Sequence, residues 1–296
     1  MTGIKRYLAI ICALCLTLAV SACGQDTAMH PDIAKPGASF SADVELTQDI
    51  KLSAPGNAQY IYELGVDIEK SKAQIEECLD ADLDDYENSS LTDGGISYTV
   101  GDWTADIMPE NGYWTLSYNG QREGAASDIS DERAVAVAAE YLRSHGLLGD
   151  IKSSDAMGLC EGLKSDGTQG VLYKEPYFYP QVEGMDVLGM FRIAVLVNTD
   201  EKVIGVQYLM SDVVGKTQVQ LADRAELERT IAAKDYSPSF SQNLSDTQIT
   251  QADYRLYADG VAVDGKTYLY PVLVLKGVGK TADGSTESFD IIVDAQ

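Results

Sequence analysis

Residues 96–118, ISYTVGDWTADIMPENGYWTLSY, contain three short segments that are separated by turn residues. The segments ISYTV (96–100), WTADIM (103–108) and YWTLSY (113–118) are rich in aromatic and β-branched side chains, which favour strands. The junctions VGD and PENG carry residues that favour tight turns. The stretch therefore predicts an antiparallel meander of three strands.

The clearest helix is expected within SDISDERAVAVAAEYLRSHG (127–146). Ser130 can cap its start, and acidic residues at positions 131 and 132 suit the positive end of the helix dipole. Gly146 stands where a left-handed residue often ends a helix. The apolar stripe of this helix is expected to consist of Ala134, Val137, Ala138, Tyr141 and Leu142.

Two further helices are expected on either side of this one. VDIEKSKAQIEECLDADL (66–83) carries apolar residues at helical spacing, namely Ile68, Ile75 and Leu79. ADRAELERTIAA (222–233) has Asp223 and Glu226 at capping-box spacing, with Leu227 and Ile231 facing inward. Strand-rich segments fill the regions between and after the helices, at 171–181, 191–210 and 253–295, with hairpin turns at 198–202 and 283–284.

The order of helix, strands, helix, strands predicts an α+β fold in which each antiparallel sheet has a covering helix. We expect two tandem helix-plus-sheet units that follow an N-terminal α+β region. The expected boundaries are a signal peptide at 1–22, a flexible tether at 23–41, the N-terminal region at 42–125, the first unit at 126–215 and the second unit at 216–296.

The first 22 residues have the parts of a secretory signal: basic Lys5 and Arg6, an apolar run, and small residues before Cys23. The run from Tyr7 to Ala22 is shorter than the roughly 20 residues that cross a bilayer. The residues around Cys23, VSACG, resemble the lipobox of bacterial lipoproteins, which implies lipid attachment at Cys23 and a chain held on the extracytoplasmic face of the cell membrane. An ordinary signal peptide is the alternative.

The chain is strongly acidic, with 46 Asp and Glu against 22 Lys and Arg and a net charge of -24. Loss of the two bases in the signal peptide would bring the charge to 20 minus 46, or −26. Such a charge repels phosphates, so nucleic acid and anionic lipid surfaces are poor partners. Solubility explains the charge most simply, and attraction of divalent cations or of a basic partner is the alternative.

Only two of the five cysteines fall in the expected folded part, Cys78 and Cys160. Outside the cytoplasm two cysteines can form a single disulfide. Two buried free thiols are the other outcome, and the sequence leaves both open because it does not fix the Cα separation.

Residues from about 130 to the end resemble the extracytoplasmic module of the YycH/YycI group, which is related to PepSY-type domains. The resemblance rests on the helix DERAVAVAAEYLRSHGL, on YPQVEGMDV with Tyr179, Gln181, Gly184 and Val187, on the helix after VGKTQVQLADRAELE, and on YLYPVLVLKG with the closing FDIIVDA. It implies tandem units and a role in binding or regulating an envelope protein such as a sensor kinase. Two features depart from the group: Met185 stands where such sheets often have proline, and a lipobox would leave no transmembrane helix.

No catalytic motif is present in the sequence. The two histidines are His30, in the expected tether, and His145, at a helix end where a cation offsets the dipole. The motifs Gly-x-Ser-x-Gly, Ser-x-x-Lys and His-Glu-x-x-His are absent, which disfavours triad hydrolases and histidine-ligated zinc enzymes. We therefore expect no enzyme activity, no catalytic residue and no cofactor.

The acidic run DADLDDYEN resembles the start of a calcium loop, with Asp80, Asp82 and Asp84 at alternate positions. Asp85 replaces the required turn glycine and Leu91 replaces the closing glutamate, so we expect a solvated connection and no metal. A glycosidase needs only two carboxylates about 5 to 9 Å apart, and the sequence neither excludes nor selects such a pair.

Two groups of aromatic residues are candidates for anchoring a sugar, a peptide or a protein partner. Strand alternation would place about half of each group in the core instead. The groups are Trp103, Tyr113 and Trp114 in the meander, and Tyr177, Phe178 and Tyr179 before PQVEG.

Together these features predict a non-enzymatic lipoprotein that binds or regulates another envelope protein. One alternative is a carboxylate-dependent hydrolase of cell-wall glycan. Another is the solute-binding lipoprotein of a transporter, which the lack of a repeated parallel βαβ pattern disfavours.

Overall fold

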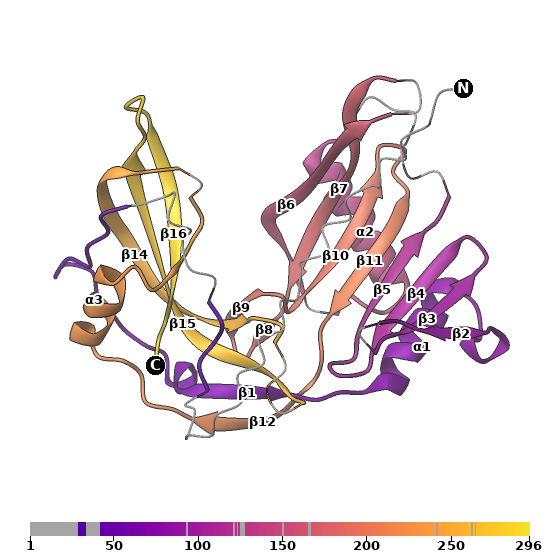
Figure 1. Cartoon of the computed structure of the whole chain (residues 1–296), viewed down its shortest axis with the longest axis horizontal. Helices are drawn as coiled ribbons and strands as arrows, with labels where there is room; N and C mark the ends of the chain where they lie inside the picture. The colour runs from indigo at the N-terminus through magenta and orange to yellow at the C-terminus, as the bar shows by residue number, and fades with distance from the viewer. Residues whose placement is uncertain are drawn as a thin grey trace.

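The computed structural model arranges the chain as two β-sheets that diverge like the arms of a V from a shared base (Figure 1). Strands β1 and β12 run along the base of the second sheet in this view. The residues that the structure describes are 29–33, 42–92, 94–120, 122, 124, 128–149, 151–164, 167–240, 242–261, 263 and 265–296. The expected signal peptide and Cys23 lie outside the described residues.

The first sheet contains eight strands, and every neighbouring pair is antiparallel. The expected meander forms at the predicted residues because its turns match the predicted junctions. In spatial order the strands are β2 (Asn88–Ser90), β3 (Ile96–Val100), β4 (Trp103–Met108), β5 (Tyr113–Tyr118), β11 (Val203–Leu209), β10 (Arg192–Asn198), β7 (Gln169–Tyr179) and β6 (Lys152–Leu163).

The second sheet is mixed, since its β14 and β9 run parallel and its other pairs are antiparallel. Its main path is β12 (Val213–Gln218), β1 (Tyr60–Leu64), β15 (Thr267–Lys280), β14 (Ser245–Ala258), β9 (Met185–Gly189) and β8 (Gln181–Val182). Strand β16 (Thr286–Asp294) pairs with β15 and with the short β13 (Ser237–Pro238).

The expected α+β class is therefore wrong, because the molecule is mostly β, with 47% strand and 17% helix. Its three α-helices in the described residues are α1 (Ile68–Leu79), α2 (Asp131–Ser144) and α3 (Arg224–Ala232). The 3-10 turn η1 (Gly56–Gln59) precedes β1, and η2 (Leu83–Asp85) follows α1. The expected tandem arrangement, with one covering helix for each sheet, is also not found: α1 and α2 both pack on the first sheet, and α3 packs on the second. Strands β1 and β9 leave their sequence neighbours and join the C-terminal strands. Alternation and turn signals predict strands well, but they carry no information about which distant strand will be the partner.

Helices α2 and α3 begin at the caps that the sequence predicts, and α1 lies within its predicted stretch. Ser130 accepts a hydrogen bond from the backbone N–H of Arg133, and Asp223 accepts one from Glu226. Asp67 caps α1 by accepting from the N–H of Lys70. Gly146 follows α2 with a φ of 65°, as the predicted left-handed stop.

Helices α1 and α2 share one core with the first sheet, on one of its faces. That core includes Ile75 from α1 and the buried stripe of α2, and it surrounds the indole of Trp114. Trp114 stacks on Tyr208 with ring centroids 5.1 Å apart, and its Nε1 donates to Gln74 at 3.0 Å. These contacts join α1, β5 and β11, and they fill the interior near the base of this arm.

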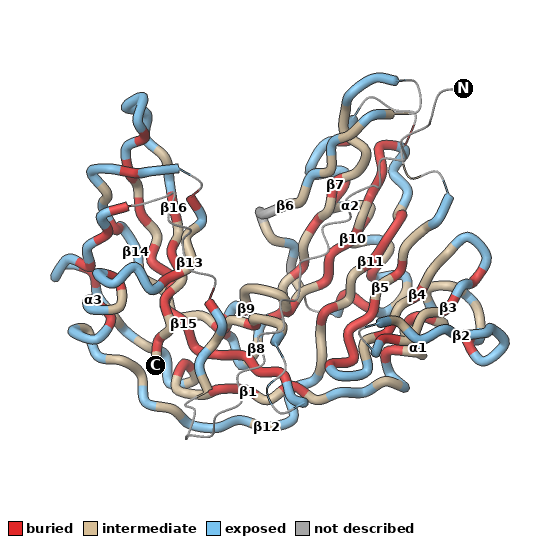
Figure 2. Tube along the Cα trace, viewed as in Figure 1, coloured by how far each residue is buried: buried red, intermediate tan, exposed pale blue. Residues whose placement is uncertain are grey.

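Strand β15 is the buried centre of the second sheet (Figure 2). Leu273 and Leu275 face one core, together with α3 and with residues 42–50. Val272 and Val274 face the opposite side, where Ile33 packs on them. A strand buried on both faces needs a cover on each side, which explains its nearly continuous apolar sequence.

Residues 29–33, which we call the strap, provide part of that second cover. They belong to the segment expected to be a flexible tether. His30 Nδ1 lies 2.6 Å from Asp294 Oδ2, and the backbone N–H of Asp32 donates to Asp259 at 2.9 Å. Gln296 Nε2 donates to the carbonyl of Met29 at 3.1 Å, and Ile33 is only 8% exposed. The strap thus connects the N-terminal part of the chain to the last strand.

We predict that Ile33→Ala lowers the free energy of unfolding by about 2 kcal/mol, the lower end of the cost of truncating a buried isoleucine. Chemical denaturation of the full chain measures the change. Val261→Ala, at a residue 38% exposed, is the matched control and should change stability by less than about 0.5 kcal/mol. Equal effects of the two substitutions would show that the strap does not pack on β15.

Candidate functional site

A hollow with aromatic walls lies beside α2 at the turn between β10 and β11. We call it the aromatic groove. Its volume is about 810 Å³, within the range of about 300 to 1,000 Å³ that is common for binding sites. Its aromatic and aliphatic lining consists of Trp103, Tyr118, Val137, Tyr141, Val203 and Ile204.

Trp103 and Tyr118 form one wall of the groove. They are directly opposite each other on β4 and β5, and their ring centroids are 5.3 Å apart at an interplanar angle of 57°. Both side chains are half-buried. The tilted pair therefore presents an angled aromatic surface that remains accessible.

The other wall comes from α2, where Val137 and Tyr141 lie. Both residues belong to the predicted buried stripe, yet only Ala134, Ala138 and Leu142 are fully buried. The core covers only part of the stripe, and the remaining side chains line the groove. Tyr141 is fixed by a hydrogen bond with the thiol of Cys78 on α1, and burial raises the pKa of its hydroxyl, which stays protonated.

The rim of the groove carries an ion pair. Arg133 Nη2 lies 2.6 Å from Glu201 Oε2, and the negative charge of Glu140 further raises the pKa of the Arg133 guanidinium. The hydrogen bond from Arg133 lowers the pKa of the Glu201 carboxyl, which is therefore ionised at neutral pH. An ionised carboxylate is unsuited to act as the general acid that glycoside hydrolysis requires.

The β10–β11 turn holds Glu201 in place. The side-chain oxygen of Asn198 accepts from the backbone N–H groups of Asp200 and Lys202, at 3.1 and 3.0 Å. Glu201 itself has a φ of 62°, in the left-handed region. The side-chain hydrogen bonds of Asn198 stabilise this turn, as expected for an asparagine at a turn position.

Of the six predicted partner-binding aromatics, only Trp103 lines the groove. Trp114 and Phe178 are buried in the first core. Tyr113 is also buried, and its pKa is raised by burial and, to a smaller extent, by the carboxylate of Asp259, which follows β14. Tyr177 and Tyr179 are half-buried on β7, and the guanidinium of Arg192 lies 4.5 Å from the Tyr177 ring centroid.

Tyr118, Tyr141, Arg133 and Glu201 were missed as site residues. Tyr118 could have been found from the hairpin register, because counting outward from the PENG turn pairs Trp103 with it. The other three come from α2 and from a distant hairpin. No sequence signal in the single chain brings these two elements together.

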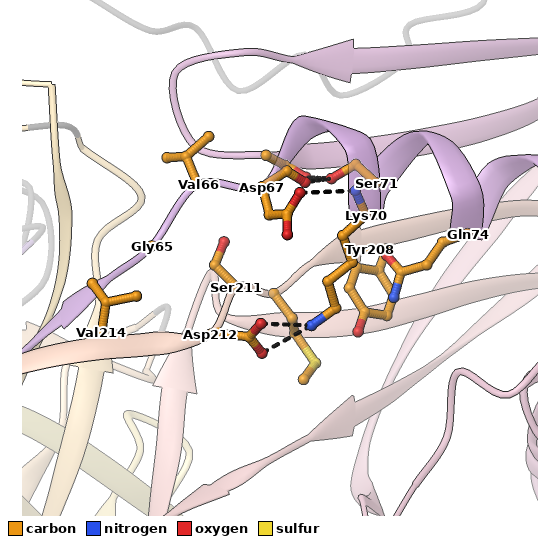
Figure 3. Close-up of a pocket in the computed structure, with 12 residues that line it drawn as sticks. Gly65, Val66, Asp67, Lys70, Ser71, Gln74, Tyr208, Ser211, Asp212 and Val214 are labelled. Carbon is orange, nitrogen blue, oxygen red and sulfur yellow. Dashed lines mark hydrogen bonds and ion pairs between the residues drawn. The ribbon is translucent and has the colours of Figure 1, made fainter.

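A smaller pocket of about 220 Å³ lies where the two arms meet (Figure 3). There the Lys70 ammonium points to Asp212 and binds both carboxylate oxygens, at 2.9 and 2.7 Å. Ser71 donates to the carbonyls of Asp67 and Gly112. These polar groups satisfy one another, so the pocket is best described as a joint between β1, α1 and β12.

The two histidines have structural partners. His145 Nδ1 lies 2.8 Å from the carbonyl oxygen of Tyr141, at the end of α2, as its predicted helix-end role implies. His30 contacts Asp294 through the strap. Burial raises the pKa of the Asp294 carboxyl, and the hydrogen bonds from Gln296 and His30 partly offset this effect.

The acidic run forms turns instead of a cation loop. Asp80 ends α1 with a φ of 48°, Asp82 accepts from the N–H of Asp84, and Asp84 pairs with Lys72. Within the described residues, no group of three or more His, Cys, Asp or Glu side chains is arranged to hold a metal ion.

Cys78 and Cys160 are free, half-buried thiols on separate elements, α1 and β6. Cys78 contacts Tyr141, whereas Cys160 is hydrogen-bonded to Tyr173 on β7. The structure therefore contains the second of the two outcomes that the sequence left open.

No protein-family model matches the chain, and no curated protein matches it. Among solved structures, an uncharacterized protein from Eubacterium rectale ATCC 33656 is similar, with a TM-score of 0.45 and 10% sequence identity. The likeness covers 80% of this chain and 83% of that chain. Its description gives no activity.

None of the helices in the described ranges is long and apolar enough to cross a membrane.

We predict that alkylation in denaturant, without a reductant, modifies both Cys78 and Cys160, as measured by mass spectrometry of the peptides that carry them. In the native protein at pH 8 the Cys78 peptide should react slowly, because burial raises the pKa of its thiol to about 11. A disulfide-linked pair of these two peptides would contradict the structure.

Proposed function

We propose that this chain is a membrane-anchored, extracytoplasmic binding protein without catalytic activity, which holds another envelope protein through the aromatic groove. The observation that carries the proposal is the accessible Trp103–Tyr118 wall facing Tyr141 across a hollow of binding-site size. Aromatic side chains are the residues that most often anchor protein interfaces.

The state of the groove's charges supports binding over hydrolysis. Arg133 holds the Glu201 carboxylate ionised. Burial raises the pKa of three carboxyls, those of Glu175, Asp259 and Asp294. None of the three lines the groove. The carboxyls whose pKa burial raises, as a general acid requires, thus lie outside the groove lining.

The strap supports a position near the membrane. If Cys23 carries lipid, as its lipobox-like surroundings predict, only residues 24–28 separate the anchor from Met29. Six Cα steps span at most about 20 Å, so the second sheet would stay close to the bilayer surface. The groove on the other arm would then meet the exterior parts of membrane proteins. The resemblance to the YycH/YycI group stays a prediction and would fit such a partner.

Site-specific photo-cross-linking in intact cells tests the proposal. A photoreactive residue at Val137 or Val203, in the groove, should give a discrete adduct with an envelope protein. The same residue at Val261, in the connection between β14 and β15 and outside the groove lining, is the matched control and should give none. Trp103→Ala should abolish the groove adducts.

The anchor is tested in the same experiment by Cys23→Ala, which lacks the sulfur for lipid attachment. This variant should leave the membrane fraction or stay unprocessed, and the groove adducts should be lost with it. Adducts of equal yield from Val137 and Val261, or adducts that persist with Trp103→Ala, would contradict the proposal.

A further inference from the structure

We infer that the aromatic groove recognises a cationic side chain, an arginine or lysine in a basic segment of the partner. This inference rests on the proposed function and adds the chemical class of the ligand. It is argued from the aromatic wall, from the groove's own charges and from the charge of the surrounding chain.

The aromatic wall has the chemistry to bind a cation. The face of a tryptophan or tyrosine ring attracts ammonium and guanidinium groups, and tryptophan does so most strongly. Elsewhere in the molecule, cations of the chain itself lie over aromatic rings: Arg192 over Tyr177, and Lys216 over Tyr60 and Tyr62. Among the described residues, no Arg or Lys lies over Trp103 or Tyr118. The backbone of Gly120 lies against the Tyr118 ring, so Trp103 offers the ring face that we infer a cation from outside to contact.

The groove's own cations leave the site net acidic. Its lining includes two bases, Arg133 and Lys202, and three acids, Glu140, Asp200 and Glu201, for a net charge of 2 minus 3, or −1. Arg133 is engaged by Glu201 and is influenced by Glu140. An anionic ligand would have to break the Arg133–Glu201 ion pair to reach a positive charge. A cationic ligand would bind without breaking it, because the lining has one more acid than it has bases.

The chain around the wall reinforces this preference. Residues 73–121 include Trp103 and Tyr118 and contain eleven Asp and Glu but no Lys or Arg, although Lys72 pairs with Glu76 and Asp84 and Arg122 donates to the carbonyl of Tyr118. The described residues of this range include the second half of α1 and strands β2 to β5, of which β4 and β5 supply Trp103 and Tyr118 to the groove. A negative field of this extent draws positively charged partners and repels acidic ones. Charge complementarity thus selects a basic segment over a neutral or acidic one.

The chain provides its own optical reporter, since it has two tryptophans. Trp103 lines the groove, whereas Trp114 is fully buried in the first core. The probe is the peptide acetyl-Arg-Arg-Arg-amide, titrated into the full-length protein at low salt. We expect a saturable change in emission that Trp103→Phe abolishes, while acetyl-Gln-Gln-Gln-amide produces no change.

Calorimetry on matched variants separates groove binding from diffuse attraction. Trp103→Ala should weaken tri-arginine binding about tenfold, as the loss of a cation–aromatic contact predicts. Tyr86→Ala, at an exposed aromatic outside the groove, should leave the affinity unchanged. Glu140→Gln should weaken binding about threefold, and Glu226→Gln on α3, which removes the same charge from the other arm, by less than 1.5-fold.

Three outcomes would overturn the inference: equal binding of the tri-glutamine peptide, equal losses in Glu140→Gln and Glu226→Gln, or binding of tri-N-acetylchitotriose in place of tri-arginine. The last result would make the groove a sugar site. Trp103-dependent cross-links in cells without tri-arginine binding would leave the proposed function standing and remove only the cationic ligand. Folding of each variant is checked by the emission of buried Trp114, and Trp103→Phe, which keeps a ring in the wall, should bind with intermediate affinity.

Discussion

The burial of β15 on both faces is the constraint on which the rest of the architecture depends. Its residues from Thr267 to Leu275 are all buried, and such a strand is stable only if both faces are covered. One cover comes from α3 and residues 42–50, and the other includes the strap. Because the N-terminal segment is committed to this arm, any anchor at Cys23 would be attached next to the second sheet. The first arm is then left to carry the groove.

The groove itself follows from a mismatch between a helix and its sheet. The stripe of α2 is wider than the core beneath it, so Val137 and Tyr141 extend past the covered region toward Trp103 and Tyr118. Filling this hollow would normally stabilise the fold, because apolar surface would leave water. The groove nevertheless stays unfilled beside a net acidic rim, and we explain this by a partner that binds there.

Local features of this fold could be predicted from the sequence, and non-local ones could not. The three meander strands were predicted to the residue, and the caps of α2 and α3 act as expected, since turn chemistry and capping depend on neighbours in the chain. The fold class was wrong because β1 and β9 pair with strands far away in sequence. For the site, Trp103 was identified, but its neighbours Tyr141 and Glu201 come from elements that only the tertiary fold brings together.

Hydrogen exchange of the full-length protein, with and without acetyl-Arg-Arg-Arg-amide, tests the central claim most directly. The account predicts added protection in peptides from α2 and from the β10–β11 turn, the two elements that enclose the groove with β4 and β5. Peptides from β14 to β16 should exchange at unchanged rates. Protection confined to the second sheet, or spread evenly over both arms, would contradict the claim that the aromatic groove is the binding surface.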